Sequence, residues 1–205
     1  MTTGCPKFRM LIFLSAATLI LIACGKTAPT RFYILRPMAD PPNASPPVPA
    51  DEITIAVLPV NMPEHLNRSQ IVTRQSRHAV TVNEFNRWAE PLDASFTMIL
   101  AENLSLLLNS NRISVLSRLK FSRYDYHLKV DIIRFDGQIG GEAVLICRWS
   151  LFSGDEKSVL VVQRSDIKRP VEGNDYQGLV ATLSRIVADL SQEIADRVLT
   201  LEKAS

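Results

Sequence analysis

The stretch YDYHLKVDIIRF, residues 124–135, decides the fold, because apolar and polar side chains alternate along it. A period of two residues is typical of a β-strand with one buried face and one face in water. We expect the buried face to carry Tyr124, Tyr126, Leu128, Val130 and Ile132.

The two segments that follow repeat this alternation. Glycines at positions 137, 140 and 141 predict a hairpin loop after the first strand. A turn at residues 153–155 leads into a further strand over residues 158–164. The apolar side of the middle strand consists of Ala143, Leu145, Cys147, Trp149 and Leu151. Residues 124–164 therefore predict an antiparallel meander of three strands.

Shorter apolar runs upstream predict further strands. Residues 53–60, ITIAVLPV, are almost entirely apolar, which is typical of a central strand buried on both faces. Residues 71–74 and 78–82 predict a short hairpin, and residues 113–116 predict a buried strand.

Two longer segments have apolar residues at intervals of three and four, as in amphipathic helices. The first is expected to open at Pro91, where a missing N–H costs nothing, and to end at residues 109–111. The second follows Asn174 or Asp175, either of which can cap a helix.

The order of these elements predicts one α/β domain without internal repeats. We expect a mixed, mostly antiparallel sheet of about seven strands, with two long amphipathic helices packed on it. The chain has 205 residues, of which 46% are hydrophobic, and this suffices for one globular core.

The first 23 residues have the layout of a cleaved secretory signal. Lys7 and Arg9 form a basic start, and residues 10–23 carry no charge. As a helix, the uncharged stretch would be about 21 Å long, which is short against the roughly 30 Å of a bilayer's hydrocarbon core.

The end of this signal, LIAC at residues 21–24, resembles a bacterial lipobox. The resemblance implies cleavage between Ala23 and Cys24 and attachment of a diacylglycerol and an N-acyl chain to Cys24, with no other cofactor. Gly25 then stands where an aspartate would favour retention at the inner membrane, so we expect an outer-membrane lipoprotein that faces the periplasm. An uncleaved signal anchor with an incidental cysteine is the alternative.

Cleavage also changes the charge balance. It removes two of the 23 basic residues, Lys7 and Arg9, and none of the 21 acidic ones, which leaves 21 against 21. A neutral mature chain gives no electrostatic reason to expect binding to nucleic acid.

Residues 24–30 are expected to form the lipidated start of a tether, and residues 31–205 the domain. Residues 37–50 hold six of the twelve prolines and predict an extended loop. If Phe32 to Leu35 form a strand of the sheet, the tether is six residues long, or roughly 20 Å. If they lie outside the domain, it is much longer. We favour the strand, because a free apolar run in a tether is a liability.

The motifs of common catalytic sites are absent from the sequence: no nucleophile elbow, phosphate loop, zinc helix or paired cysteines is present. The histidines at 65, 78 and 127 lie far apart, and each is expected at the surface or rim rather than on a metal. Cys147 shares its strand face with Leu145 and Trp149, so we expect a buried thiol rather than a nucleophile. The chain is therefore predicted not to be an enzyme.

Arginines and aromatic residues are dense between residues 59 and 91. Two accounts stay open for Arg68, Arg74, Arg87 and Trp88. The tryptophan can fill a seam while the arginines pair with Glu84 and Glu90, or the group can form a protein-binding surface, since Arg and Trp are favoured at the centres of interfaces.

Several ordered motifs resemble the ABC-type transport auxiliary lipoproteins. These are FYIL after the lipobox, IAVLPVNMPEHLNRSQIVTR at residues 55–74, and NRWAEPL before the first helix. The resemblance implies a single α/β domain without catalytic residues. It also implies an outer-membrane accessory of an MCE-type (mammalian cell entry) periplasmic protein in an intermembrane lipid transport system. A ring-like homo-oligomer is plausible on the same ground. A scaffold for outer-membrane protein or lipopolysaccharide assembly, and a lipid hydrolase, are the competing hypotheses.

Overall fold

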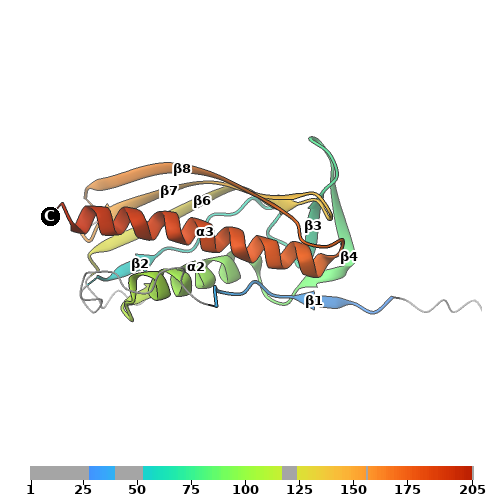
Figure 1. Ribbon diagram of the computed structural model, residues 1–205, viewed down its shortest axis with the longest axis horizontal. Helices are drawn as coiled ribbons and strands as arrows, with labels where there is room; N and C mark the ends of the chain where they lie inside the picture. Colours follow the sequence, from blue (N-terminus) through green and yellow to red (C-terminus); the bar gives the residue numbers. More distant parts are fainter. Residues whose placement is uncertain (1–27, 40–52, 117–123, 156, 205) are drawn as a thin grey trace, which may run out of the picture.

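Three long antiparallel strands form one side of the sheet in the computed structural model, which describes residues 28–39, 53–116, 124–155 and 157–204 (Figure 1). They are β6 (Tyr126–Gly137), β7 (Glu142–Ser153) and β8 (Val159–Pro170), and each pairs with the next along nearly its whole length. The predicted meander is confirmed, and its last strand runs six residues further than predicted, from 164 to 170.

The other edge of β6 is shared by two short parallel strands. β2 (Ile55–Val57) pairs with the start of β6, and β3 (Gln70–Arg74) meets its last residue. Between them, the N–H groups of Leu58 and Asn61 donate to carbonyls of β6 at 2.9 and 3.0 Å. The strand predicted over residues 53–60 is thus shorter than expected, because Pro59 has no N–H to continue a ladder.

The remaining strands extend the sheet beyond β2 and β3. β5 (Ile113–Val115) pairs with β2, β4 (Val80–Trp88) pairs with β3, and β1 (Arg31–Tyr33) pairs in parallel with β4. Among the described residues the sheet has eight strands, with long antiparallel ladders and short parallel ones. The predicted α/β domain with a mixed sheet and two long helices is confirmed.

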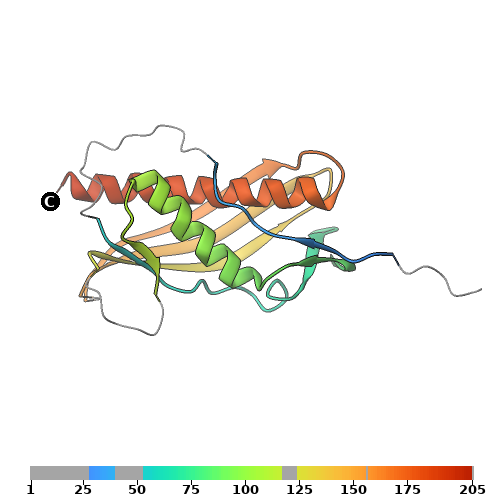
Figure 2. The same cartoon turned by 90° about the horizontal axis from the view of Figure 1, so that it is seen from below.

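The two helices of the described residues lie on one face of the sheet (Figure 2). α2 (Leu92–Leu108) starts directly after Pro91 and ends at Asn109, whose left-handed φ of 49° stops it. α3 (Tyr176–Glu202) is capped by Asp175, whose carboxylate accepts a 2.8 Å hydrogen bond from the N–H of Gly178. None of the helices that the structure describes is long and apolar enough to cross a bilayer.

The core fills the space between the sheet and the helices. Trp149 is fully buried there, and its indole N–H donates to Ser165 Oγ at 3.0 Å. Phe96 of α2 packs edge-to-face on Phe135 of β6, with ring centroids 5.1 Å apart. Cys147 is a buried free thiol, and burial raises its pKa to about 12, so it has the core position expected of it.

One histidine departs from the prediction. His65 and His78 are exposed, as expected, but His127 is buried although it alternates with the core positions of β6. The ring of Tyr124 packs against it edge-on at 5.7 Å, and Leu58 and Phe152 line the same small hollow. The polar side of this strand is therefore covered at its start.

Candidate functional site

The segment that leads from the N-terminus into the domain is built into the fold. Tyr33 of β1 is the register partner of Trp88, and its hydroxyl donates to Asn86 Oδ1 at 2.9 Å. Further on, Leu35 is buried, and the N–H of Arg36 donates to Ser184 Oγ of α3 at 3.2 Å. Of the two arrangements considered for residues 32–35, the structure has the one in which they belong to the domain.

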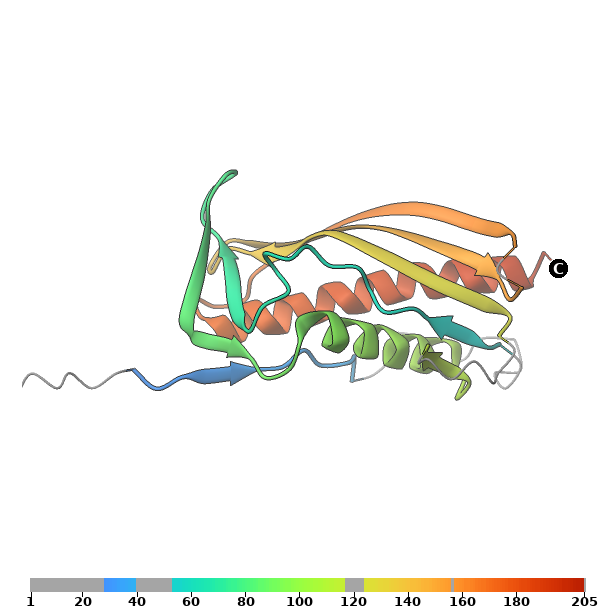
Figure 3. The ribbon, with the colours of Figure 1, turned by 180° about the vertical axis from the view of Figure 1, so that it is seen from behind.

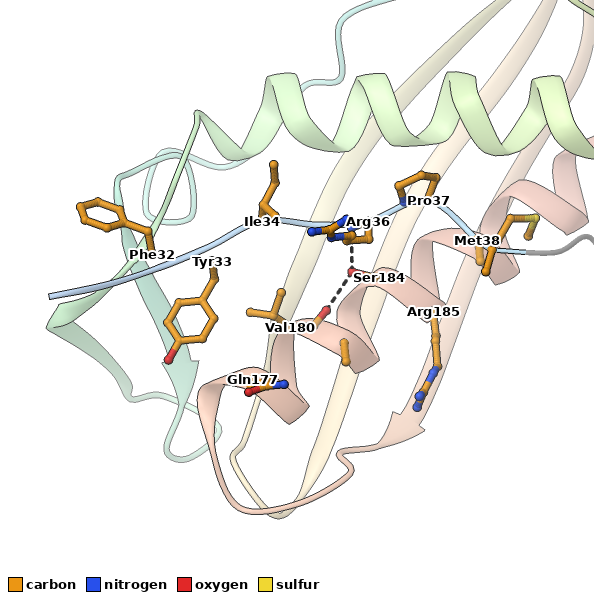
Figure 4. Close-up of a pocket in the computed structure, with 13 residues that line it drawn as sticks. Phe32, Tyr33, Ile34, Arg36, Pro37, Met38, Gln177, Val180, Ser184 and Arg185 are labelled. Atoms are coloured by element: carbon orange, nitrogen blue, oxygen red, sulfur yellow. Dashed lines mark hydrogen bonds between the residues drawn. The ribbon is translucent and has the colours of Figure 1, made fainter.

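A groove of about 800 Å³ lies between this segment and the first half of α3 (Figure 4). Ala181, Ser184 and Ala188 leave room along the helix, and Phe32 and Ile34 stand on the opposite wall with 65% and 44% of their surface exposed. A groove of this volume, lined mainly by apolar side chains, has the dimensions of a small-molecule site.

Two arginines give the groove its charge. Arg185 is held by Glu172 through a 2.5 Å ion pair, and this hydrogen bond lowers the pKa of the exposed Glu172 carboxyl. Arg36 lines the groove as well, and its side chain makes no ion pair with any residue that the structure describes.

The predicted Arg/Trp cluster is not one continuous surface. Trp88 is only 6% exposed and belongs to the core, and its backbone N–H donates to the carbonyl of Ser69 at 2.7 Å. It reaches the surface only as part of a hollow of about 330 Å³, which Arg68 also lines. For Trp88 the seam-filling account fits the observed packing.

Arg68 and Arg87 meet through two neighbouring polar residues. Arg87 forms a 3.1 Å ion pair with Glu84, and Gln70 donates to Glu84 at 3.1 Å while it accepts from Arg68 at 3.3 Å. The hydrogen bond from Gln70, followed by that from Arg87, lowers the pKa of the exposed Glu84 carboxyl. Arg68 is exposed and Arg87 is half-buried, so both reach the surface.

Arg74 lies apart from them and has a partner inside the chain. Its guanidinium pairs with Asp136, whose side chain is fully buried, and Arg134 donates to the other carboxylate oxygen at 2.8 Å. The sequence indicated a turn residue at 136 and did not reveal this cluster, because Arg74 and Asp136 are 62 positions apart. The groove was also missed, although small residues recur at helical spacing along α3.

The predicted lipidation site, Ala23 and Cys24, lies outside the described residues. Within the described part of the chain, no three histidine, cysteine or acidic side chains are grouped as metal ligands would be. The raised pKa of Cys147 keeps its thiol protonated near neutral pH, so this side chain is a poor nucleophile.

Comparison with known proteins gives a family and a fold. The model of a family described as "ABC-type transport auxiliary lipoprotein component" matches residues 33–195. Protein XCC0632 from Xanthomonas campestris has a similar structure, with a TM-score of 0.71, 16% identity, and coverage of 85% of this chain and 98% of that one. An uncharacterized protein of known crystal structure has a TM-score of 0.67 and 22% identity, over 83% and 99% of the two chains. None of the curated proteins matches.

Proposed function

The chain belongs to the family of ABC-type transport auxiliary lipoprotein components, and from this premise we propose that it docks an MCE-type lipid conduit at the outer membrane. In this role, Cys24 carries the acyl chains that hold the protein on the periplasmic side of that membrane. The protein is an accessory and does not catalyse a reaction itself.

The place of β1 in the sheet is the observation that carries this proposal. Because Arg31 already pairs with Asn86 of β4, only residues 25–30 separate the proposed anchor from the domain. Six residues span about 20 Å when extended. An anchor at Cys24 would therefore keep this end of the domain close to the membrane, where a conduit that crosses the periplasm ends.

Arg68 and Arg87 fit the docking role by position. Arg87 lies on β4 as the register partner of Phe32 of β1, and Arg68 lies just before β3, which pairs with β4. Both are therefore near β1, from which the tether leaves the domain. Arginine is favoured at protein interfaces; Arg68 is exposed, and Arg87 is half-buried. We propose these two residues, rather than Arg74 or Trp88, as the contacts to the MCE-type protein.

Crosslinking in intact cells tests the proposal. Wild-type protein should fractionate with the outer membrane and should be crosslinked to an MCE-type protein. Cys24→Ala should leave the protein in the soluble periplasmic fraction and reduce this crosslink. As a matched control, Gly25→Asp should keep the lipid but retain the protein at the inner membrane.

Two results would overturn the proposal. If Cys24→Ala were still found in the outer-membrane fraction, a lipid on Cys24 would not be the membrane anchor. Crosslinks only to outer-membrane protein or lipopolysaccharide assembly factors would replace the transport role with that of a scaffold.

A further inference from the structure

The sheet face opposite the helices carries two arginines side by side. Arg148 of β7 and Arg164 of β8 are register partners, and both are exposed while their neighbours Trp149 and Ser165 point into the core. Like charges directly opposite each other destabilise a pair of strands. The Arg148–Arg164 pair by itself is therefore unfavourable for the pairing of β7 with β8.

Neither of these two arginine side chains has an ion pair or hydrogen bond within the described part of the chain. Arg148 also faces a carboxylate, because Asp131 of β6 is its register partner on the other side, whereas Arg164 lies on the outermost strand. The nearest carboxylates on the same face are engaged elsewhere. Asp131 pairs with Lys129 at 3.2 Å, and Asp166 pairs with Lys168 at 3.8 Å. Arg164, with Arg148 beside it, therefore forms a cationic spot that is open to an external anion.

Exposed apolar side chains lie on β8 beside this spot. Leu160 and Val162 alternate with the buried Val161, and 40% and 62% of their surfaces are exposed. Because side chains on one face recur every two residues, Val162 and Arg164 form one row along the strand. Leu160 lies next to this row, at the point where the β7–β8 register shifts. Large apolar groups and a charge thus lie close together on β8.

The outer edge of β8 is open among the described residues. β8 pairs with β7 alone, and Figure 3 shows it as the outermost strand of the sheet. Its inner face is taken by α3, to which Arg169 is tied through Asp189 at 2.5 Å. Exposed edges are usually blocked by charged side chains or proline. Here these lie in the second half of the strand, at Arg164, Asp166, Lys168 and Pro170, whereas residues 159–163 contain neither.

We propose that the open edge of β8 binds an extended segment of a partner protein as an additional strand. The segment would place an acidic side chain against Arg164, with Arg148 behind it, and an apolar side chain two residues away against Val162. Strand addition of this kind takes its affinity from main-chain hydrogen bonds and its specificity from alternate side chains. The inference goes beyond the proposed docking function and does not depend on it.

A designed peptide provides the probe. The octapeptide Lys-Thr-Val-Thr-Glu-Thr-Val-Thr, labelled with fluorescein at its N-terminus and amidated at its C-terminus, presents valine, glutamate and valine on one face of a strand. It should bind the full-length protein in nonionic detergent, as measured by fluorescence anisotropy, and its affinity should fall with added salt. A peptide with glutamine in place of the glutamate should bind about tenfold more weakly, because the charge-assisted hydrogen bonds are lost.

The variant Arg164→Thr separates a binding role from a structural one. It should weaken binding of the glutamate peptide about tenfold while it raises the melting temperature, since it removes a like-charge pair and suits a strand. Lys168→Thr, on the same strand face, is the matched control and should change peptide binding less than about twofold. Leu160→Lys should also weaken binding, because a lysine on an edge strand disfavours pairing with a further strand.

Three outcomes would overturn the proposal. Equal affinity for the glutamate and glutamine peptides, with no effect of Arg164→Thr, would exclude an acidic partner segment. Concentration-dependent dimers that Leu160→Lys abolishes, without peptide binding, would assign the edge to a second copy of this chain. Binding to phosphatidylglycerol vesicles that Arg164→Thr abolishes, again without peptide binding, would assign the arginines to a lipid surface.

Discussion

At the scale of single residues, the buried carboxylate of Asp136 is neutralised by two arginines, and we call these three residues the Asp136 cluster. The carboxylate is fully buried and is held by Arg74 from β3 and Arg134 from its own strand. Removing one partner of a buried ion pair leaves a charge without compensation, and this commonly costs about 3–5 kcal/mol. The cluster thus ties the β3–β4 hairpin to the end of β6.

We therefore expect Arg74→Glu to lower the free energy of unfolding by about 3 kcal/mol, since it also places a second carboxylate beside Asp136. Chemical denaturation followed by circular dichroism measures this change. Arg87→Glu is the control, because its partner Glu84 is exposed, and it should change stability by less than about 1 kcal/mol. Similar stabilities for the two variants would mean that the buried pair contributes little.

At the scale of secondary-structure elements, β1 is a short strand whose docking depends on the residues that follow it. Leu35 is 2% exposed, whereas Phe32, three positions earlier, is largely exposed. Leu35→Ala should cost about 2–4 kcal/mol through lost packing and the cavity that remains. It should also increase amide exchange in residues 31–38 before global unfolding.

Phe32→Ala supplies the matched comparison for β1, because the two side chains lie on one segment and differ in burial. It should leave both stability and amide exchange nearly unchanged. If the two variants were equally stable, β1 would not be held by the Leu35 contact.

The elements also show which parts of the fold were predictable. The meander, α2 and α3 follow from patterns within each segment, so residues 124–153 and the caps at Pro91 and Asp175 indicated them directly. The parallel pairing of β1 with β4, the Asp136 cluster and the groove beside α3 join residues far apart in the chain. For example, Arg36 and Ser184 are 148 positions apart. No local pattern encodes such contacts.

At the scale of the whole molecule, the two ends of the described chain lie at opposite ends of the domain (Figure 1). The segment that leads to Cys24 leaves beside the β3–β4 hairpin, whereas α3 ends at the other side. An anchor on Cys24 would therefore hold the hairpin end toward the membrane and direct the far end of the meander away from it. If the tether sets this position, its length should affect how often the domain meets its membrane-bound partner.

Inserting about twelve glycine and serine residues after Lys26 tests this dependence. The tether then grows about threefold, and the effective concentration of the domain at a membrane-bound partner should fall about fivefold, because it decreases as roughly the −3/2 power of length. Crosslinking to the MCE-type protein should decrease accordingly, while outer-membrane fractionation and thermal stability stay unchanged. The same residues added after Ser205 serve as the control and should have no effect. Unchanged crosslinking with the longer tether would show that the partner, rather than the short anchor, positions the domain.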